Sequence, residues 1–178
     1  MSYSDPITIL RFVALAVAGI AMYTDLKYGL VYNKLTFPAM LLGFVLNTLF
    51  FGITGFMYSF LACLAGIAIY MPAGALGLVG MGDVKLMGAI GALGGSNFVL
   101  SVFLFTSAIG LPHAIAVQYL NYRKDAFMMM LTSFTTGAFK NKTIHNENKH
   151  NNKYKFYLGA DIFLATLIAC FYSFQISW

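Results

Sequence analysis

The sequence predicts an all-α polytopic membrane protein with about six transmembrane helices. Hydrophobic residues make up 60% of its 178 residues and charged residues only 10%, and the mean hydropathy is +0.76. The 11 basic and 6 acidic side chains are too few to cover the surface of a water-soluble protein of this size, and long uncharged runs separate them. These observations exclude a soluble globular domain.

The expected spans follow from runs that meet or nearly meet the length needed to cross the hydrocarbon core, about 20 largely apolar residues. In chain order these are residues 7–23, 36–53, 56–78, 98–119 and 156–174, the last of which contains Asp161. A short glycine-rich span, with the sequence LMGAIGALGG, fits between residues 80 and 95. The first run lacks the basic start and small-residue cleavage site of a signal peptide, so we expect it to be retained. Residues 1–178 are expected to form one membrane-embedded domain.

The basic residues predict the orientation of these spans. Ten of the 11 fall in three connections: Lys27 and Lys34 after the first span, Lys85 after the third, and the remainder within residues 123–155. The connections at 52–55 and 94–97 carry no charge. Because basic residues collect in cytoplasmic loops, the odd-numbered connections are expected in the cytoplasm and the N-terminus outside. The net charge of +5 therefore indicates orientation and not a nucleic-acid partner.

The connection at 120–155 has two parts. Its first part, KDAFMMMLTSFTTGAF, has apolar residues at helical spacing and predicts a helix lying in the membrane interface. Its second part, KNKTIHNENKHNNK, has the composition of a disordered tether. We interpret the whole as a solvated basic cytoplasmic loop; the alternative is a docking site for anionic lipid or for a basic leader peptide.

Metal and cofactor sites are not expected. Cys63 and Cys170 lie in apolar runs with no CxxC pair, which predicts free thiols. His145 and His150 lie in the Asn/Lys-rich tether, and His113 follows Pro112 within a span, where a hydrogen-bonded interior histidine is the favoured interpretation.

Three of the six acids lie where the membrane makes a carboxylate costly, by about 2.5–3.5 kcal/mol at mid-bilayer. Asp25 ends the first span and Asp83 begins the fourth, so both are expected at the cytoplasmic edge, and Asp161 enters the last span as a weaker third candidate. Asp25 and Asp83 could instead be ordinary interfacial acids, each neutralised by the lysine two residues later. Residues two apart on a helix do not face each other, so Lys27 and Lys85 are better interpreted as headgroup anchors.

The sequence around Asp83 favours a catalytic role. Gly80 and Gly82 precede it and would permit positive φ and a close approach of another chain. The run GMGDVKLMGAIGALGG resembles the GxGD segment of the type IV prepilin peptidases, which are membrane aspartyl proteases. The later glycines of this run would allow the fourth span to pack tightly on its neighbours.

A second segment, DLKYGLVYNKLT, is similar to the region around the family's first aspartate. Asp25, Asn33, Leu35 and Thr36 fit that pattern, whereas Val31 and Tyr32 stand where Ile-Pro is usual. We favour a simple capping role at the second span for Asn33 and Thr36. The chain has neither the extra domain nor the paired CxxC motifs of members that also methylate their product, so the resemblance implies a short, peptidase-only form.

The resemblance implies that Asp25 and Asp83 are the catalytic pair and that no cofactor or metal is needed. Gly80, Gly82, Lys27 and Lys85 are candidates for substrate contact or active-site backbone. The implied substrate is a prepilin or pseudopilin precursor whose basic leader is cut at the cytoplasmic face of the inner membrane. Two carboxylates about 6 Å apart repel by roughly 3 kcal/mol and would share one proton.

Two other classes of function stay open. A small transporter or channel component would use Asp25, Asp83 and Asp161 as an ion or proton relay, with the acids spread along a pathway. A catalytically silent scaffold would tolerate the replacement of either acid by asparagine.

Overall fold

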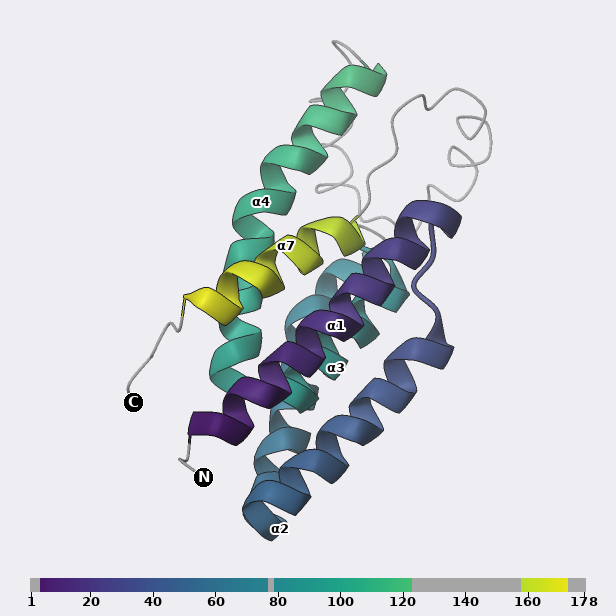
Figure 1. The fold of residues 1–178 in the computed structure, drawn as a ribbon. Coiled ribbons are helices and arrows are strands. Elements are labelled where there is room, and N and C mark those ends of the chain that lie inside the picture. The colour runs from purple at the N-terminus through teal and green to yellow at the C-terminus, as the bar shows by residue number, and fades with distance from the viewer. Residues whose placement is uncertain (1–3, 77–78, 123–157, 173–178) are drawn as a thin grey trace.

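The computed structural model describes residues 4–76, 79–122 and 158–172, and in these residues every regular element is an α-helix. Figure 1 shows α1 (Ser4–Tyr28), α2 (Asn33–Ala75), α3 (Met81–Gly94), α4 (Ser96–Tyr122) and α7 (Leu158–Phe171). Apart from the end of α4, the 120–155 connection lies outside the described residues, and so do His145 and His150. The expectation of an all-helical chain is confirmed for the described part.

Three helices are long and apolar enough to cross a membrane: Pro6–Tyr28, Asn33–Ala75 and Ser96–Val117. The first covers the expected span at 7–23, the second overlaps those at 36–53 and 56–78, and the third overlaps that at 98–119. The last expected span corresponds to α7, an apolar helix of only 14 residues, and the short glycine-rich span corresponds to α3. The structure thus supports a membrane protein, but the count of six transmembrane helices is not confirmed.

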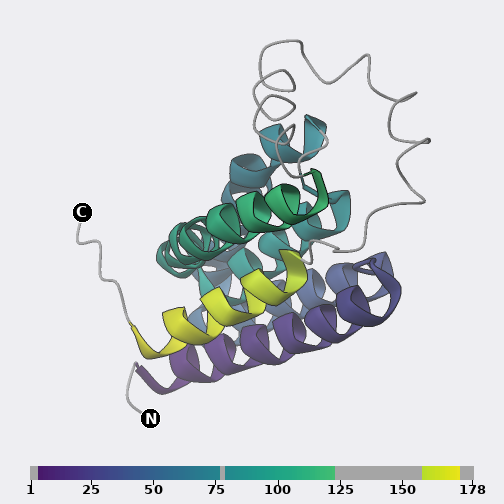
Figure 2. The same cartoon turned by 90° about the horizontal axis from the view of Figure 1, so that it is seen from above.

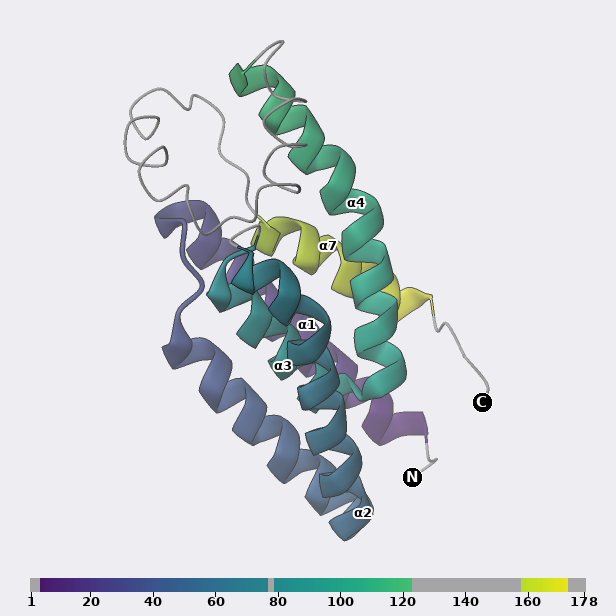
Figure 3. The ribbon, with the colours of Figure 1, turned by 180° about the vertical axis from the view of Figure 1, so that it is seen from behind.

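The second and third expected spans both overlap α2, whose helical conformation is interrupted at Gly52. That residue has φ 67° and ψ −155°, a conformation that glycine adopts without steric penalty. The two arms of α2 fold back beside each other, as Figure 3 shows, and Phe44 on the first arm contacts the rings of Phe56 and Phe60 on the second. The break falls where the sequence placed an uncharged connection.

Helix α3 packs tightly against both arms of α2, and small residues make this approach possible. A Cβ atom on Gly66 of α2 would lie 2.5 Å from the carbonyl oxygen of Met87, and one on Gly43 would lie 2.7 Å from the backbone of Ala92. Gly91 of α3 is pressed equally closely against Ala62. The expected tight packing of the glycine-rich span is therefore confirmed.

Both ends of α3 are fixed. At its C-terminal end, the Ala92 carbonyl accepts hydrogen bonds from the side chains of Asn47 and Ser59, one on each arm of α2. Such carbonyls have no partner within their own helix, so side chains must satisfy them. At its N-terminal end, Gly82 lies against Val31 in the connection between α1 and α2.

Helix α7 lies between α1 and α4, and both contact it (Figure 2). Helix α3 forms the buried centre, with Leu86, Met87, Ile90 and Leu93 at most 1% exposed. The start of α3 therefore lies next to the end of α1 and the start of α7, and these three helix termini carry the acids.

Candidate active site

Asp25 lies in the last turn of α1. The helix ends after Tyr28 because Gly29 adopts φ 67°, and the Gly29 amide donates to the Asp25 carbonyl at 2.7 Å. A glycine in this left-handed conformation is a common helix terminator. The local sequence thus places Asp25 one turn before the end of its helix, at the expected edge.

Asp83 lies in the first turn of α3, three residues after the N-cap residue Gly80. The Asp83 amide donates to the Gly80 carbonyl at 3.0 Å, and the Asp83 carboxylate accepts a hydrogen bond from the Gly80 backbone amide. The contact of the Asp83 side chain with the Gly80 amide is one half of a capping box, with aspartate in place of the usual glutamate or glutamine. The other half is missing, because Gly80 has no side chain to accept from the Asp83 amide.

The conformation of the two glycines differs from the expectation. Gly80 has φ −65°, and the glycines with positive φ in the described residues are Gly29, Gly52 and Gly95. Gly80 and Gly82 therefore do not use the positive φ that glycine permits; Gly80, as an N-cap residue, needs only an extended backbone. What these glycines provide is space: a Cβ on Gly80 would lie 2.9 Å from Asp83 Oδ2, and one on Gly82 would lie 2.8 Å from the Val31 carbonyl oxygen.

The charge of Asp25 acts on Asp83 although 57 residues lie between the two acids in the sequence. Each is only 8% exposed, and the charge of Asp25 is close enough to repel that of Asp83. Asp83 Oδ1 has no hydrogen-bond partner among the described residues. In that part of the chain neither acid forms an ion pair, and the charges that act on them are those of other acids: Asp25 acts on Asp83, and Asp161 acts on Asp25.

A third acid, Asp161, lies beside this pair in the first turn of α7. It is 3% exposed, and its charge acts on Asp25. His113 Nδ1 lies 3.0 Å from both oxygens of Asp161, which makes His113 the hydrogen-bonded histidine that the sequence suggested. Asp161 is thus more closely connected with the candidate site than its interpretation as a weaker third candidate implied.

Two neighbours of the acids were not anticipated from the sequence. The Gly159 amide donates to Asp25 Oδ2 at 2.9 Å. The hydroxyl of Tyr70, buried on α2, hydrogen-bonds with that of Thr106 and lies near Asp83 and Asp161. Both belong to helices far from Asp25 in the sequence, and no local pattern marked either residue.

The two lysines have partners other than the acids. Lys85 Nζ donates to Asn33 Oδ1 at 2.9 Å and lies over the Phe37 ring, and Lys27 Nζ donates to the Tyr23 hydroxyl at 3.3 Å. The capping role expected of Asn33 is wrong: Tyr32 is the N-cap residue of α2 and makes no side-chain cap. The Asn33 side chain instead connects the start of α2 to α3.

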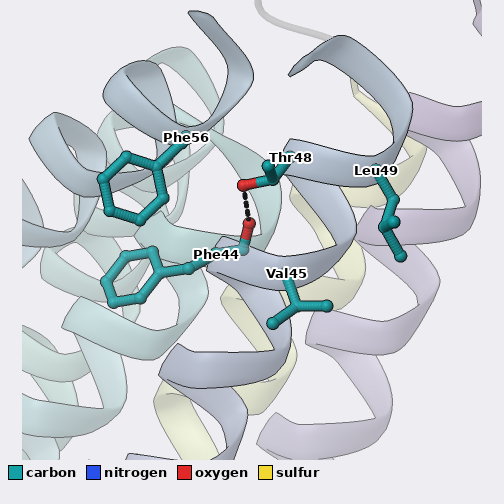
Figure 4. A pocket seen from close by; sticks show the side chains of 5 residues that line it. All are labelled: Phe44, Val45, Thr48, Leu49 and Phe56. Carbon is teal, nitrogen blue, oxygen red and sulfur yellow. Dashed lines mark hydrogen bonds between the residues drawn. The ribbon is translucent and has the colours of Figure 1, made fainter. Parts of the chain in front are cut away.

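Other kinds of site find little support in the described residues. No group of three His, Cys, Asp or Glu side chains there could hold a metal ion. A pocket of about 230 Å³ lies near the Gly52 break, lined by Phe44, Val45, Thr48, Leu49 and Phe56 (Figure 4). Its lining is apolar, and it lies at the end of α3 opposite Asp83.

The family comparison covers the part of the chain that contains Asp25 and Asp83. The model of the type IV leader peptidase family matches residues 12–115, a segment that ends before Gly159 and Asp161. No curated protein and no solved structure matches the chain.

Proposed function

The chain belongs to the type IV leader peptidase family, whose model covers more than half of its residues, and on this premise we propose that it is a membrane aspartyl endopeptidase. Its substrates are prepilin or pseudopilin precursors, from which it removes a short basic leader. The observation that carries the proposal is the meeting of Asp25 and Asp83, two buried carboxyl groups that repel each other at the ends of α1 and α3.

The proposed chemistry is hydrolysis by general acid and base catalysis. Two adjacent buried carboxyl groups favour a state in which one is protonated and the other is ionised. The ionised group takes a proton from water, whose oxygen attacks the scissile carbonyl carbon, while the protonated group donates to the carbonyl oxygen. Collapse of the tetrahedral intermediate breaks the C–N bond, and a proton passes to the leaving amine. The shared proton belongs to the pair, so the roles of base and acid are not assigned to individual residues.

The backbone around Asp83 suggests where the substrate lies. Gly80 is exposed beside the buried carboxyl group, whereas the space next to Gly82 is filled by Val31. The backbone groups of Gly80 are already used by α3, so an extended substrate segment could lie along the exposed face of this glycine and bring its carbonyl to Asp83. The Asp83 oxygen next to Gly80 is Oδ2, whereas Oδ1 is buried and has no partner among the described residues.

The cellular setting follows from the charge pattern of the sequence. We place the catalytic face in the cytoplasm and the N-terminus outside the inner membrane, with the whole chain acting as one domain. Exposed Lys27 lies over the rings of Tyr23 and Tyr28 at this edge, which suits an anchor among lipid headgroups. The basic leader would remain in the cytoplasm while the apolar helix of the precursor stays in the membrane.

The test is cleavage of a precursor by the full-length protein purified in detergent. The precursor has a short basic leader ending in glycine followed by an apolar helix, and mass spectrometry identifies the N-terminus of the product. We expect one cut after that glycine by the wild-type protein and none by Asp25→Asn or Asp83→Asn. Asp5→Asn is the matched control, because it changes an acid of the same helix about 30 Å from Asp25 and should leave cleavage unchanged.

An ion or proton relay is the second candidate, and the position of Asp161 beside Asp25 is the observation that favours it. The detergent assay separates the two functions because it contains no membrane and therefore no ion gradient. Cleavage under these conditions would exclude a requirement for a gradient. Failure of the wild-type protein to cut any precursor, or normal cutting by either asparagine variant, would overturn the dyad proposal.

A further inference from the structure

The ion pair between His113 and Asp161 connects two helices that are distant in the sequence. His113 lies on α4 and Asp161 on α7, and these helices are separated in the sequence by residues 123–157. His113 Nδ1 is 3.0 Å from each oxygen of Asp161, whose side chain is 5% exposed, whereas that of His113 is 37% exposed. A carboxylate can only accept, so the imidazole donates through Nδ1–H.

The same turn of α7 also reaches α1. The Gly159 amide, two residues before Asp161, donates to Asp25 Oδ2 at 2.9 Å. Residues two apart on a helix do not face the same side, so this turn binds α1 through its backbone and α4 through a side chain. We propose that His113 and Asp161 are positioning residues, whose ion pair holds α7 so that the Gly159 amide fixes the Asp25 carboxyl group opposite Asp83. This inference rests on the proposed peptidase function.

The fit at Gly159 is tight enough for small displacements to matter. A Cβ at this position would lie 2.8 Å from Asp25 Oδ2 and 2.9 Å from Asp25 Cβ, and both distances are shorter than the contacts that Cβ atoms make in proteins. Position 159 therefore transmits any shift of α7 directly to Asp25. Misplacement of a reacting group by about 1 Å can reduce a reaction rate by about a hundredfold.

The groups around Asp161, the third acid of the site, come from three other helices. The groups that face Asp161 are Asp25 on α1, Tyr70 on α2 and His113 on α4. Of these three groups, only His113 is seen to form a hydrogen bond with Asp161 in the described part of the chain. Held by His113, Asp161 contributes its charge to the field at Asp25.

The experiment measures kcat and KM for precursor cleavage by the full chain in detergent, with two substitutions at one position. His113→Ala removes the donor, and we expect kcat to fall at least tenfold while KM stays within twofold. His113→Asn places an amide N–H near the position of Nδ1, and we expect kcat to recover to within threefold of wild type. A merely structural role would lower the folded fraction without this recovery by the conservative variant.

Two glycines provide a second comparison. Gly159→Ala inserts a methyl group against Asp25, and we expect about a hundredfold loss of kcat. Gly110→Ala is the control, because its Cβ would lie 3.5 Å from Asp161 Oδ2, an ordinary contact distance, and cleavage should stay within threefold. Equal activity of His113→Ala and wild type, or equal losses in the two glycine variants, would overturn the inference.

Hydrogen exchange tests the same contact without requiring cleavage. The Gly159 amide should exchange at least tenfold faster in His113→Ala and Asp161→Ala than in wild type, because its partner Asp25 is no longer held in place. Unchanged exchange in both variants would refute the positioning role. If exchange accelerates but wild type cuts no precursor, the peptidase proposal fails while the structural link stands; if wild type cuts and exchange is unchanged, only the positioning inference fails.

Discussion

Asparagine and alanine at positions 25 and 83 separate the catalytic role of each carboxyl group from its structural role. The structure gives each carboxylate a backbone donor: Gly159 for Asp25 and Gly80 for Asp83. The side-chain oxygen of asparagine can accept the same hydrogen bond, but it cannot exchange a proton at neutral pH. Alanine removes the acceptor as well. Both substitutions remove the negative charge, so the difference between them isolates the hydrogen bond.

The expected magnitudes follow from these contacts. General acid or base catalysis contributes about 10² to 10⁴ in rate, so each asparagine variant should lose at least two orders of magnitude in kcat. Its folding stability should equal or exceed that of wild type, because the repulsion between the two acids is relieved. Asp25→Ala leaves the buried Gly159 amide without its acceptor, which costs about 1–3 kcal/mol relative to Asp25→Asn. For a chain of this length that corresponds to a melting temperature lower by about 2–12 °C.

The assay combines precursor cleavage with thermal unfolding of the same detergent preparation. The expected order of melting temperatures at position 25 is asparagine at or above wild type, with alanine lowest. Asp83→Ala should also melt below Asp83→Asn, by less than at position 25, because the exposed Gly80 amide can turn to water. Cleavage by Asp83→Asn within tenfold of wild type, or an alanine variant as stable as the asparagine variant at position 25, would refute the reasoning.

Three other substitutions test how α3 is held. Gly82→Ala should lower kcat at least tenfold, because its methyl group would lie 2.8 Å from the Val31 carbonyl oxygen and displace the start of α3; unchanged kcat would contradict this. Gly66→Ala should destabilise the fold by about 1–3 kcal/mol in thermal unfolding, since its Cβ would meet the backbone of α3 at 2.5 Å; an unaltered melting temperature would disprove the close packing. Lys85→Met should cost less than about 1.5 kcal/mol and leave kcat within threefold, because Lys85 bonds Asn33 and not an acid; loss of cleavage in this variant would instead assign Lys85 to the substrate site.

Much of the fold was predictable because the membrane imposes a simple length rule on apolar runs. The runs at 7–23 and 98–119 lie within α1 and α4, and the uncharged connection at 52–55 coincides with the break at Gly52. The short glycine-rich run between residues 80 and 95 coincides with α3, and within the described residues α7 covers Leu158–Phe171 of the expected span at 156–174. The C-terminal end of α3 is held by tertiary contacts, those of the Asn47 and Ser59 side chains with the Ala92 carbonyl, which no local pattern encodes.

The candidate site was predictable to the extent that it depends on depth in the membrane. Asp25 and Asp83 were expected at one edge because one ends a span and the other begins one, and the structure places them together. Gly159 and Tyr70 could not be found in this way, because their importance lies in which helix each contacts. The expected cap of α2 does not form because the helix begins one residue earlier than that cap requires, with Tyr32 as N-cap, and the Asn33 side chain accepts from Lys85 instead.

The three acids lie at helix termini, and this location reconciles their burial with their proposed chemistry. A carboxylate in the middle of an apolar helix would find every backbone donor already used, whereas the first turn of a helix has free amides. Gly80 and Gly159 offer such amides to Asp83 and Asp25 without a side chain in the way. The repulsion between the acids, which favours proton sharing, also tends to separate α1 from α3. The contacts of α1 with α3 and α7 oppose that separation, while the glycine-rich sequence after Asp83 holds α3 itself in place against α2.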